Sequence, residues 1–227
     1  MKRVLIVAAH PDDETLGCGG LIAKHRLRGT EFSILFIAEG SSCRYTDPQC
    51  EQSFRAVSAR TAQARAALAQ LGVARMHFQD LPCGRLDQVP IIEINKLIEA
   101  EIRDFCPDTV FTHSSNDANN DHRIIFNSTI MATRPGAQNH VSRVLSYEVL
   151  STSEWAFTGT YAPNCFEPLS ADDLEVKWKA LACYETELRA YPFPRSREGV
   201  RALSMVRGMQ AGCEYAEAFH LIREINL

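Results

Sequence analysis

The sequence contains no Cys-x-x-Cys pair, although it has eight cysteines among its 227 residues. That spacing is typical of thiolate zinc sites and redox motifs, so we expect neither. No apolar run approaches the ~18 residues that a membrane helix needs, and the start of the chain does not resemble a signal peptide. We therefore expect a cytoplasmic protein with free thiols and no membrane span. The alternative, a disulfide between Cys43 and Cys50 across a polar loop, is disfavoured in a reducing compartment.

Neither sign of charge dominates, since 24 Lys and Arg residues face 28 Asp and Glu residues. This balance gives no electrostatic reason to expect nucleic acid or an anionic membrane as a partner. Flexible linkers, low-complexity tracts and internal repeats are also missing. We therefore predict a single domain over residues 1–227. A homo-oligomer is expected, although no sequence feature specifies the number of subunits.

Strand-length apolar runs alternate with helical patterns through most of the chain. The expected strands are residues 4–9, 32–38, 75–78, 108–113 and 144–149. The expected helices are residues 14–28, 54–71, 91–105, 121–133, 172–187 and 198–212. Residues 151–170 are expected to be loop or short strand. This order predicts an α/β fold, a Rossmann-like, mainly parallel sheet with helices on both faces and an α-rich C-terminal extension.

Two clusters of histidine and acidic residues follow expected strands. The first is His10, Asp12, Asp13 and Glu14, and the second is His113, Asp117, Asn119, Asn120, Asp121 and His122. Because parallel strands end at the same sheet edge, we expect the clusters to meet in space. Two histidines and one carboxylate would leave metal positions open for water and substrate, as in catalytic zinc sites. A spare carboxylate would remain for proton transfer.

Simpler interpretations of the first cluster account for less of it. A turn in which an aspartate caps a helix explains one acid, but not three acids beside a histidine. Gly17, Gly19 and Gly20 suggest a nucleotide-binding Rossmann domain, the rival from another class. Their spacing fits G-x-G-x-x-G poorly, and the preceding acids would repel a pyrophosphate. We therefore expect these glycines to serve close packing of a helix on the sheet.

The residues Ala9-His10-Pro11-Asp12-Asp13-Glu14, with Asp121-His122 downstream, resemble the PIG-L/LmbE-like zinc deacetylases, which remove N-acetyl groups from amino sugars. The resemblance extends over most of the chain. It implies that His10, Asp13 and His122 ligate the metal. It also implies that Asp12 is the general base and later the acid that protonates the leaving amine.

One position departs from the family pattern. Many members have His-Pro-Asp-His where this sequence has Asn119-Asn120-Asp121-His122. The first histidine of that motif helps to stabilise the oxyanion, and Asn119 offers only a neutral amide donor. Either Asn119 keeps the role, or His113, Arg60 or the metal takes it. One such donor is worth ~10² to 10³ in rate.

Two acids are expected to support the site rather than to react. Asp121 is expected either to cap the following helix or to hold a metal ligand. Glu14 is expected in the first turn of a helix, where the helix dipole favours it, or behind the ligands.

The sequence thus predicts a zinc-dependent N-deacetylase, although Fe²⁺ or Co²⁺ would also suit the ligands. The expected substrate is a small N-acetylated amino sugar, free, nucleotide-linked or part of a glycoconjugate. The alternatives are an amidase acting on a larger mycothiol-like conjugate and a non-catalytic sugar-binding member of the family.

Overall fold

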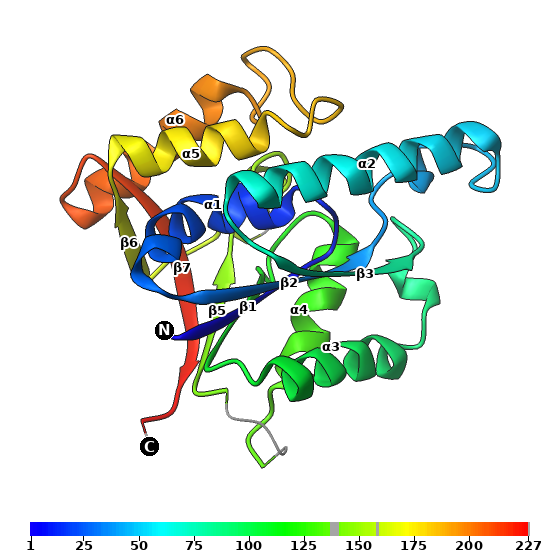
Figure 1. Ribbon diagram of the computed structural model, residues 1–227, viewed down its shortest axis with the longest axis horizontal. Helices are drawn as coiled ribbons and strands as arrows, with labels where there is room; N and C mark the ends of the chain where they lie inside the picture. Colours follow the sequence, from blue (N-terminus) through cyan, green and yellow to red (C-terminus); the bar gives the residue numbers. More distant parts are fainter. Residues whose placement is uncertain (137–140, 158, 227) are drawn as a thin grey trace.

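A seven-stranded sheet forms the centre of the computed structural model, which describes residues 1–136, 141–157 and 159–226 (Figure 1). The strands are β1 (Arg3–Ala8), β2 (Glu31–Ala38), β3 (Arg75–Leu81), β4 (Thr109–His113), β5 (Arg143–Tyr147), β6 (Cys165–Leu169) and β7 (Tyr215–Glu224). Their order in the sheet is β3-β2-β1-β4-β5-β7-β6. The first five are mutually parallel, and β7 runs antiparallel to both β5 and β6. The predicted α/β class with a mainly parallel sheet is confirmed.

Helices cover both faces of the sheet, as Figure 1 shows. The helices are α1 (Asp13–His25), α2 (Glu51–Gln70), α3 (Ile91–Phe105), α4 (Asn120–Ala132), α5 (Ala171–Leu181) and α6 (Arg197–Ala211). Side chains of β1 alternate between two apolar cores, because successive residues of a strand point to opposite faces. Ile6 and Ala8 pack with α1, α2 and α5, whereas Leu5 and Val7 pack with α3 and α4. Burial on both faces explains the unbroken apolar run of β1.

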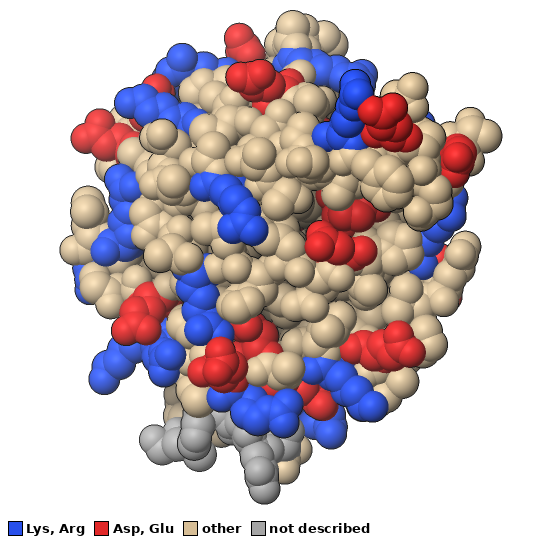
Figure 2. All heavy atoms as spheres, turned by 45° about the vertical axis from the view of Figure 1, so that its right-hand side comes forward, with Lys and Arg blue, Asp and Glu red and all other residues tan. Residues whose placement is uncertain are grey.

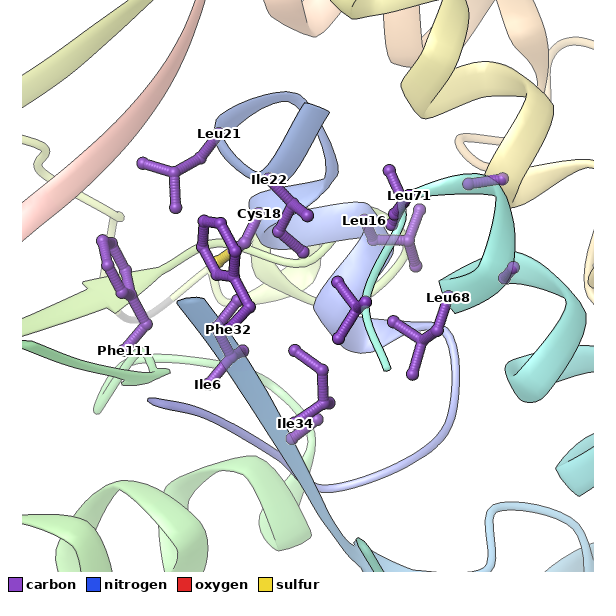
Figure 3. Packing of buried hydrophobic residues seen from close by; sticks show 14 of the residues in the cluster. Ile6, Leu16, Cys18, Leu21, Ile22, Phe32, Ile34, Leu68, Leu71 and Phe111 are labelled. Carbon is purple, nitrogen blue, oxygen red and sulfur yellow. The ribbon is translucent and has the colours of Figure 1, made fainter. Parts of the chain in front are cut away.

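Helix α1 lies close against the sheet. Its residues Leu16, Cys18, Leu21 and Ile22 are buried with Ile6, Phe32, Ile34 and Phe111 of the strands (Figure 3). A Cβ atom at Gly17 would lie 2.2 Å from Cδ2 of Tyr147, and one at Gly20 would lie 2.4 Å from Cδ1 of Leu169. The expected packing of the helix on the sheet is therefore confirmed for Gly17 and Gly20. A Cβ atom at Gly19 would instead lie 2.9 Å from Cγ of Lys177 in α5.

Strand β7 was not expected from the sequence. Glu217 is the third residue of this strand and is buried, and Lys177 Nζ donates to its carboxylate over 2.7 Å. The same carboxylate accepts the backbone N–H groups of Gly20 and Leu21, each over 2.7 Å. A charge at a buried strand position is tolerated only with such partners, which a sequence pattern does not reveal.

The other differences concern boundaries. Helix α5 ends at Leu181 rather than at 187, and the chain then turns. Helix α2 begins at Glu51 rather than at 54, because the side chain of Cys50 accepts the Ser53 N–H and caps it. The single domain over 1–227 stays a prediction, and residues 137–140, 158 and 227 of that range lie outside the described residues.

The surface carries charges of both signs. On the face drawn in Figure 2, basic and acidic side chains of the described residues alternate in small groups. Within the described ranges, no helix is both long and apolar enough to cross a membrane.

Candidate metal centre

The three expected metal ligands lie together where β1 and β4 end. His10 and Asp13 flank the turn from β1 to α1, and His122 is in the first turn of α4. Because β1 and β4 are neighbours, these two turns meet at one edge of the sheet. Asp13 Oδ2 is 3.5 Å from His10 Nδ1 and 3.3 Å from His122 Nε2. One potential ligand atom of each residue lies within 4.8 Å of the other two, and all three residues are buried.

The turn that carries the ligands is strained at Asp12. Its φ of 115° lies in the left-handed region that disfavours residues with a side chain. Backbone hydrogen bonds hold it there, because the Asp12 carbonyl accepts the N–H groups of Thr15 and Leu16 over 3.1 and 2.8 Å. Glu14 Oε2 accepts the Asp12 N–H over 3.0 Å. Such strain costs ~1–3 kcal/mol and is concentrated at functional sites.

A carboxylate fixes each of the two histidines. His10 Nε2 lies 2.9 Å from Asp121 Oδ2, and Nε2 donates because a carboxylate only accepts. The other ring nitrogen, Nδ1, therefore faces Asp13. Likewise His122 Nδ1 lies 3.2 Å from Asp117 Oδ2, which leaves Nε2 toward Asp13. Pairs of this kind orient a histidine and raise its basicity as a metal ligand.

These two carboxylates are themselves held by the chain. Asp121 accepts backbone N–H groups of Gly84 over 2.6 Å and Leu86 over 3.2 Å, from the loop after β3. Asp117 Oδ2 accepts the hydroxyls of Thr152 and Ser153 over 3.0 and 2.9 Å. Asp121 and Asp117 thus connect the loops after β3, β4 and β5 to the expected metal ligands.

The donor set fits a divalent metal ion. Among the described residues, Asp13 Oδ1 and both ring nitrogens of His122 are buried without a hydrogen-bond partner, although His122 Nδ1 is ion-paired with Asp117. A bound cation would satisfy His122 Nε2 and Asp13 Oδ1. Two imidazoles and a carboxylate are ligands that suit zinc. A second grouping of His10, Cys83 and Asp121 meets the same distance limit, but Asp121 there already accepts the hydrogen bonds just described.

Without a metal, protonated histidines pair with the carboxylates of this site. Burial lowers the pKa of His10, but its hydrogen bonds to Asp121 and Asp13 outweigh burial and raise it to about 10. Burial likewise lowers the pKa of His122, yet Asp13 and Asp117 raise it to about 9. Burial raises the pKa of Asp13, but His122 and His10 bring it well below its usual value. Because ligating histidines must be neutral, a metal would displace these protons.

Asp12 points into a different environment, which contains two arginines. Arg195 Nη1 lies 2.5 Å from Asp12 Oδ2, and Arg60 Nη2 lies 3.1 Å from Oδ1. Glu187 pairs with both arginines and also with Arg44. Burial raises the pKa of Asp12, although Arg195 and Arg60 act in the opposite direction.

The residues considered for the oxyanion lie at three different places. His113 is fully buried and stacked on His122, and its Nε2 accepts the Ala9 N–H over 2.8 Å. Asn119 lies at the start of α4, where its Oδ1 accepts the Asp121 N–H over 2.9 Å. This cap leaves the Asn119 Nδ2 group as its free donor. Arg60 is buried beside Asp12, with its Nε donating to the Pro11 carbonyl over 2.6 Å.

Several residues at the site received no role from the sequence. Glu187 and Arg195 approach Asp12 from the chain between α5 and α6, far away in sequence. Asp117 was noted in the second cluster but was not linked to His122. Tyr184 Oη donates to Glu14 Oε1 over 2.7 Å, behind Asp12. A charged pair separated by more than 100 residues leaves no local signal.

Comparison with known proteins agrees with this geometry. Residues 5–133, which contain both clusters, match the family model described as PIG-L: GlcNAc-PI de-N-acetylase. The chain belongs to the PIG-L de-N-acetylase family. This PIG-L protein is 26% identical over 234 residues to a diacetylchitobiose deacetylase of Thermococcus kodakarensis, covering 100% of this chain and 85% of the relative. It is therefore a deacetylase by family, with a buried His/Asp group that could hold a metal ion.

Two solved structures share the fold of this PIG-L protein. One is the N,N'-diacetylchitobiose deacetylase from Pyrococcus horikoshii, with a TM-score of 0.78, 22% identity and coverage of 98% of this chain and 84% of that one. The other is GalB, the 4-carboxy-2-hydroxymuconate hydratase from Pseudomonas putida KT2440, with a TM-score of 0.76, 22% identity and coverage of 100% and 98%. Since this architecture occurs in a deacetylase and in a hydratase, the fold alone does not specify the reaction.

Proposed function

We propose that this PIG-L protein hydrolyses the N-acetyl group of a small amino sugar in a zinc-dependent reaction, releasing acetate and a free amine. The observation that carries the proposal is the convergence of His10, Asp13 and His122 beside the separate carboxylate of Asp12. The similarity to a diacetylchitobiose deacetylase along the whole chain supports an N-acetylated sugar as the substrate class.

His10 through Nδ1, His122 through Nε2 and Asp13 through its carboxylate would hold the metal. When bound, zinc supplies a Lewis acid that polarises the acetyl carbonyl and lowers the pKa of water from 15.7 to about 7. Asp121 lies beside Nε2 of His10, and Asp117 lies beside Nδ1 of His122. Each carboxylate favours the proton on that nitrogen, which leaves the other ring nitrogen free to ligate the metal.

Asp12 would act as the general base and then as the general acid. It takes a proton from the attacking water and delivers it to the amide nitrogen as the C–N bond breaks. Burial raises the pKa of this carboxyl, which suits a group that must both accept and return a proton near neutral pH. Arg195 and Arg60 hold its two oxygens, so the side chain does not need to reorient between the two steps.

The test is the variant Asp12→Asn, assayed for metal content and for amine release from N-acetylated mono- and disaccharides. We expect full metal loading and a fall in kcat of ~10² to 10⁴, the usual contribution of a general acid–base group. Turnover near that of the unsubstituted protein, with metal bound, would refute the role of Asp12. Glu51→Gln, which removes an exposed acid from α2, is the matched control and is expected to keep full activity.

The same assay separates the alternatives. Release of an acyl group larger than acetate, detected by chromatography of the products, would favour an amidase acting on a larger conjugate. Sugar binding without any amine release, in fully metal-loaded protein, would favour a non-catalytic binding role.

A further inference from the structure

Two thiols lie in contact at the rim of the metal centre. Cys43 Sγ is 3.2 Å from Cys83 Sγ, and all eight cysteines are free in this structure. Cys43 is exposed and Cys83 is buried, so one thiol is accessible to reagents in solution while the other faces inward. Among the described residues, no other pair of thiols is in contact.

The chain around both cysteines is arranged for this contact. The carboxylate of Glu39 accepts the N–H of Ser42, next to Cys43, over 2.9 Å and the N–H of Cys83 over 2.8 Å. One side chain thus holds both loops. Gly84 has a φ of +71°, and a Cβ atom there would lie 3.1 Å from the Cβ of Cys43. The glycine therefore permits the close approach of the loop after β3 to Cys43.

The contact also changes the reactivity of the exposed thiol. The hydrogen bond between the two thiols lowers the pKa of Cys43 to about 6, whereas the same contact and burial raise the pKa of Cys83. The thiolate is the nucleophile in disulfide exchange, so Cys43 is the thiol that reacts first.

We propose that Cys43 and Cys83 form a redox modification site, at which a low-molecular-weight disulfide converts the two thiols into an intramolecular disulfide. The Cys43 thiolate attacks one sulfur of the reagent, forming a mixed disulfide and releasing one thiolate. Cys83, as its thiolate, then attacks Cys43 Sγ and displaces the second. Both cysteines are oxidised and the reagent is reduced to two thiolates, which take up the proton of Cys83 and one proton from solvent.

The disulfide would act on the metal centre through the loop after β3. The sulfurs must approach from 3.2 Å to about 2.05 Å, which draws Cys83 and the adjacent Gly84 toward Cys43. Gly84 N–H donates to Asp121 Oδ2, the oxygen that also holds His10 Nε2. A shift of this loop therefore changes the support of one ligand, and loss of such support typically weakens metal binding by ~10- to 100-fold.

The first experiment treats the metal-loaded protein with oxidised glutathione, blocks remaining thiols and digests it with trypsin without reduction. Cleavage after Arg28 and Arg44, and after Arg75 and Arg85, places each cysteine of the pair alone in its peptide. We expect the two peptides, residues 29–44 and 76–85, to be recovered as one cross-linked species in most chains. Phosphine reductant should separate them again.

The controls are Cys43→Ser, which should abolish the cross-link, and Cys106→Ser, which removes an exposed thiol elsewhere and should leave it unchanged. Mixed disulfides at Cys43 and Cys106 alike, with no peptide linking Cys43 to Cys83, would overturn the proposal.

The second experiment measures metal release to a chelator. We expect release to be about tenfold faster from the oxidised protein, and unaffected by oxidant in Cys43→Ser. Equal rates before and after cross-linking would overturn the coupling to the metal centre. Neither experiment uses a substrate, so both are independent of the proposed deacetylation.

Discussion

Replacing Asp121 by asparagine tests how the protein orients His10, which we propose as a metal ligand. Asp121 Oδ2 accepts from His10 Nε2 over 2.9 Å and from Gly84 N over 2.6 Å, while Oδ1 accepts from Leu86 N over 3.2 Å. Asparagine has only one acceptor oxygen, so its NH2 group would face either His10 Nε2 or the backbone N–H groups, and one of these donors would lose its acceptor. The variant also removes the charge next to His10. We expect metal affinity to fall by ~10- to 100-fold, about 1.4 to 2.8 kcal/mol.

The assay is a competition between the protein and a chelator of known affinity, followed by the free metal concentration. Asp87→Asn is the matched control, because it removes the same charge from an exposed position next to Leu86. Thermal unfolding of the metal-free proteins establishes that each variant is folded. Equal metal affinities for the folded Asp121 and Asp87 variants would refute the idea that Asp121 supports His10.

Three further predictions follow from particular contacts. Because His10 and His122 have pKa values of about 10 and 9 without metal, binding at pH 7 should release about two protons. Affinity should therefore rise with pH up to about 10, the higher of the two values. Calorimetry in buffers of different ionisation enthalpy measures the release, and binding without proton release would contradict these pKa values. Asn119→Ser should keep the helix cap but lose the amide donor, so that kcat falls without the ~1 kcal/mol stability loss expected for Asn119→Ala. An unchanged kcat in the serine variant would exclude Asn119 as the oxyanion donor. Gly17→Ala should lower the free energy of unfolding by ~1–3 kcal/mol in denaturant titrations, because its Cβ would overlap Tyr147; no loss would contradict that contact.

The parallel part of the fold was predictable because its signals are local. The run in β1 is apolar without interruption, and that pattern occurs where both faces of a strand are covered. The apolar positions of α3 repeat at helical spacing, and Ile94, Ile98 and Ile102 are all buried. Strand β7 escaped prediction because its sequence contains Glu217, whose burial depends on Lys177, 40 residues away in sequence.

The candidate site also contains some residues that local sequence signals predict and others that they do not. His10 and Asp13 could be predicted to lie together because one short turn carries both, and His122 could be added because the family motif continues there. The partners of Asp12 could not, since Arg195 is 183 residues away and reaches it only through the packing of the C-terminal segment. Ion pairs of this kind depend on tertiary structure and have no sequence period.

The adjacent residues Asp12 and Asp13 differ in proton affinity because the turn places them in different surroundings. Burial raises the pKa of both Asp12 and Asp13, so burial alone does not distinguish them. Asp13 faces the imidazoles of His122 and His10, which bring its pKa well below the usual value and keep it ionised. For Asp12, burial outweighs the opposing effect of Arg195 and Arg60, which also pair with Glu187, so its pKa stays raised. The left-handed backbone at Asp12 directs the two side chains to these separate surroundings. The strain in the turn therefore separates the acid that we propose to bind the metal from the neighbour that we propose to exchange protons.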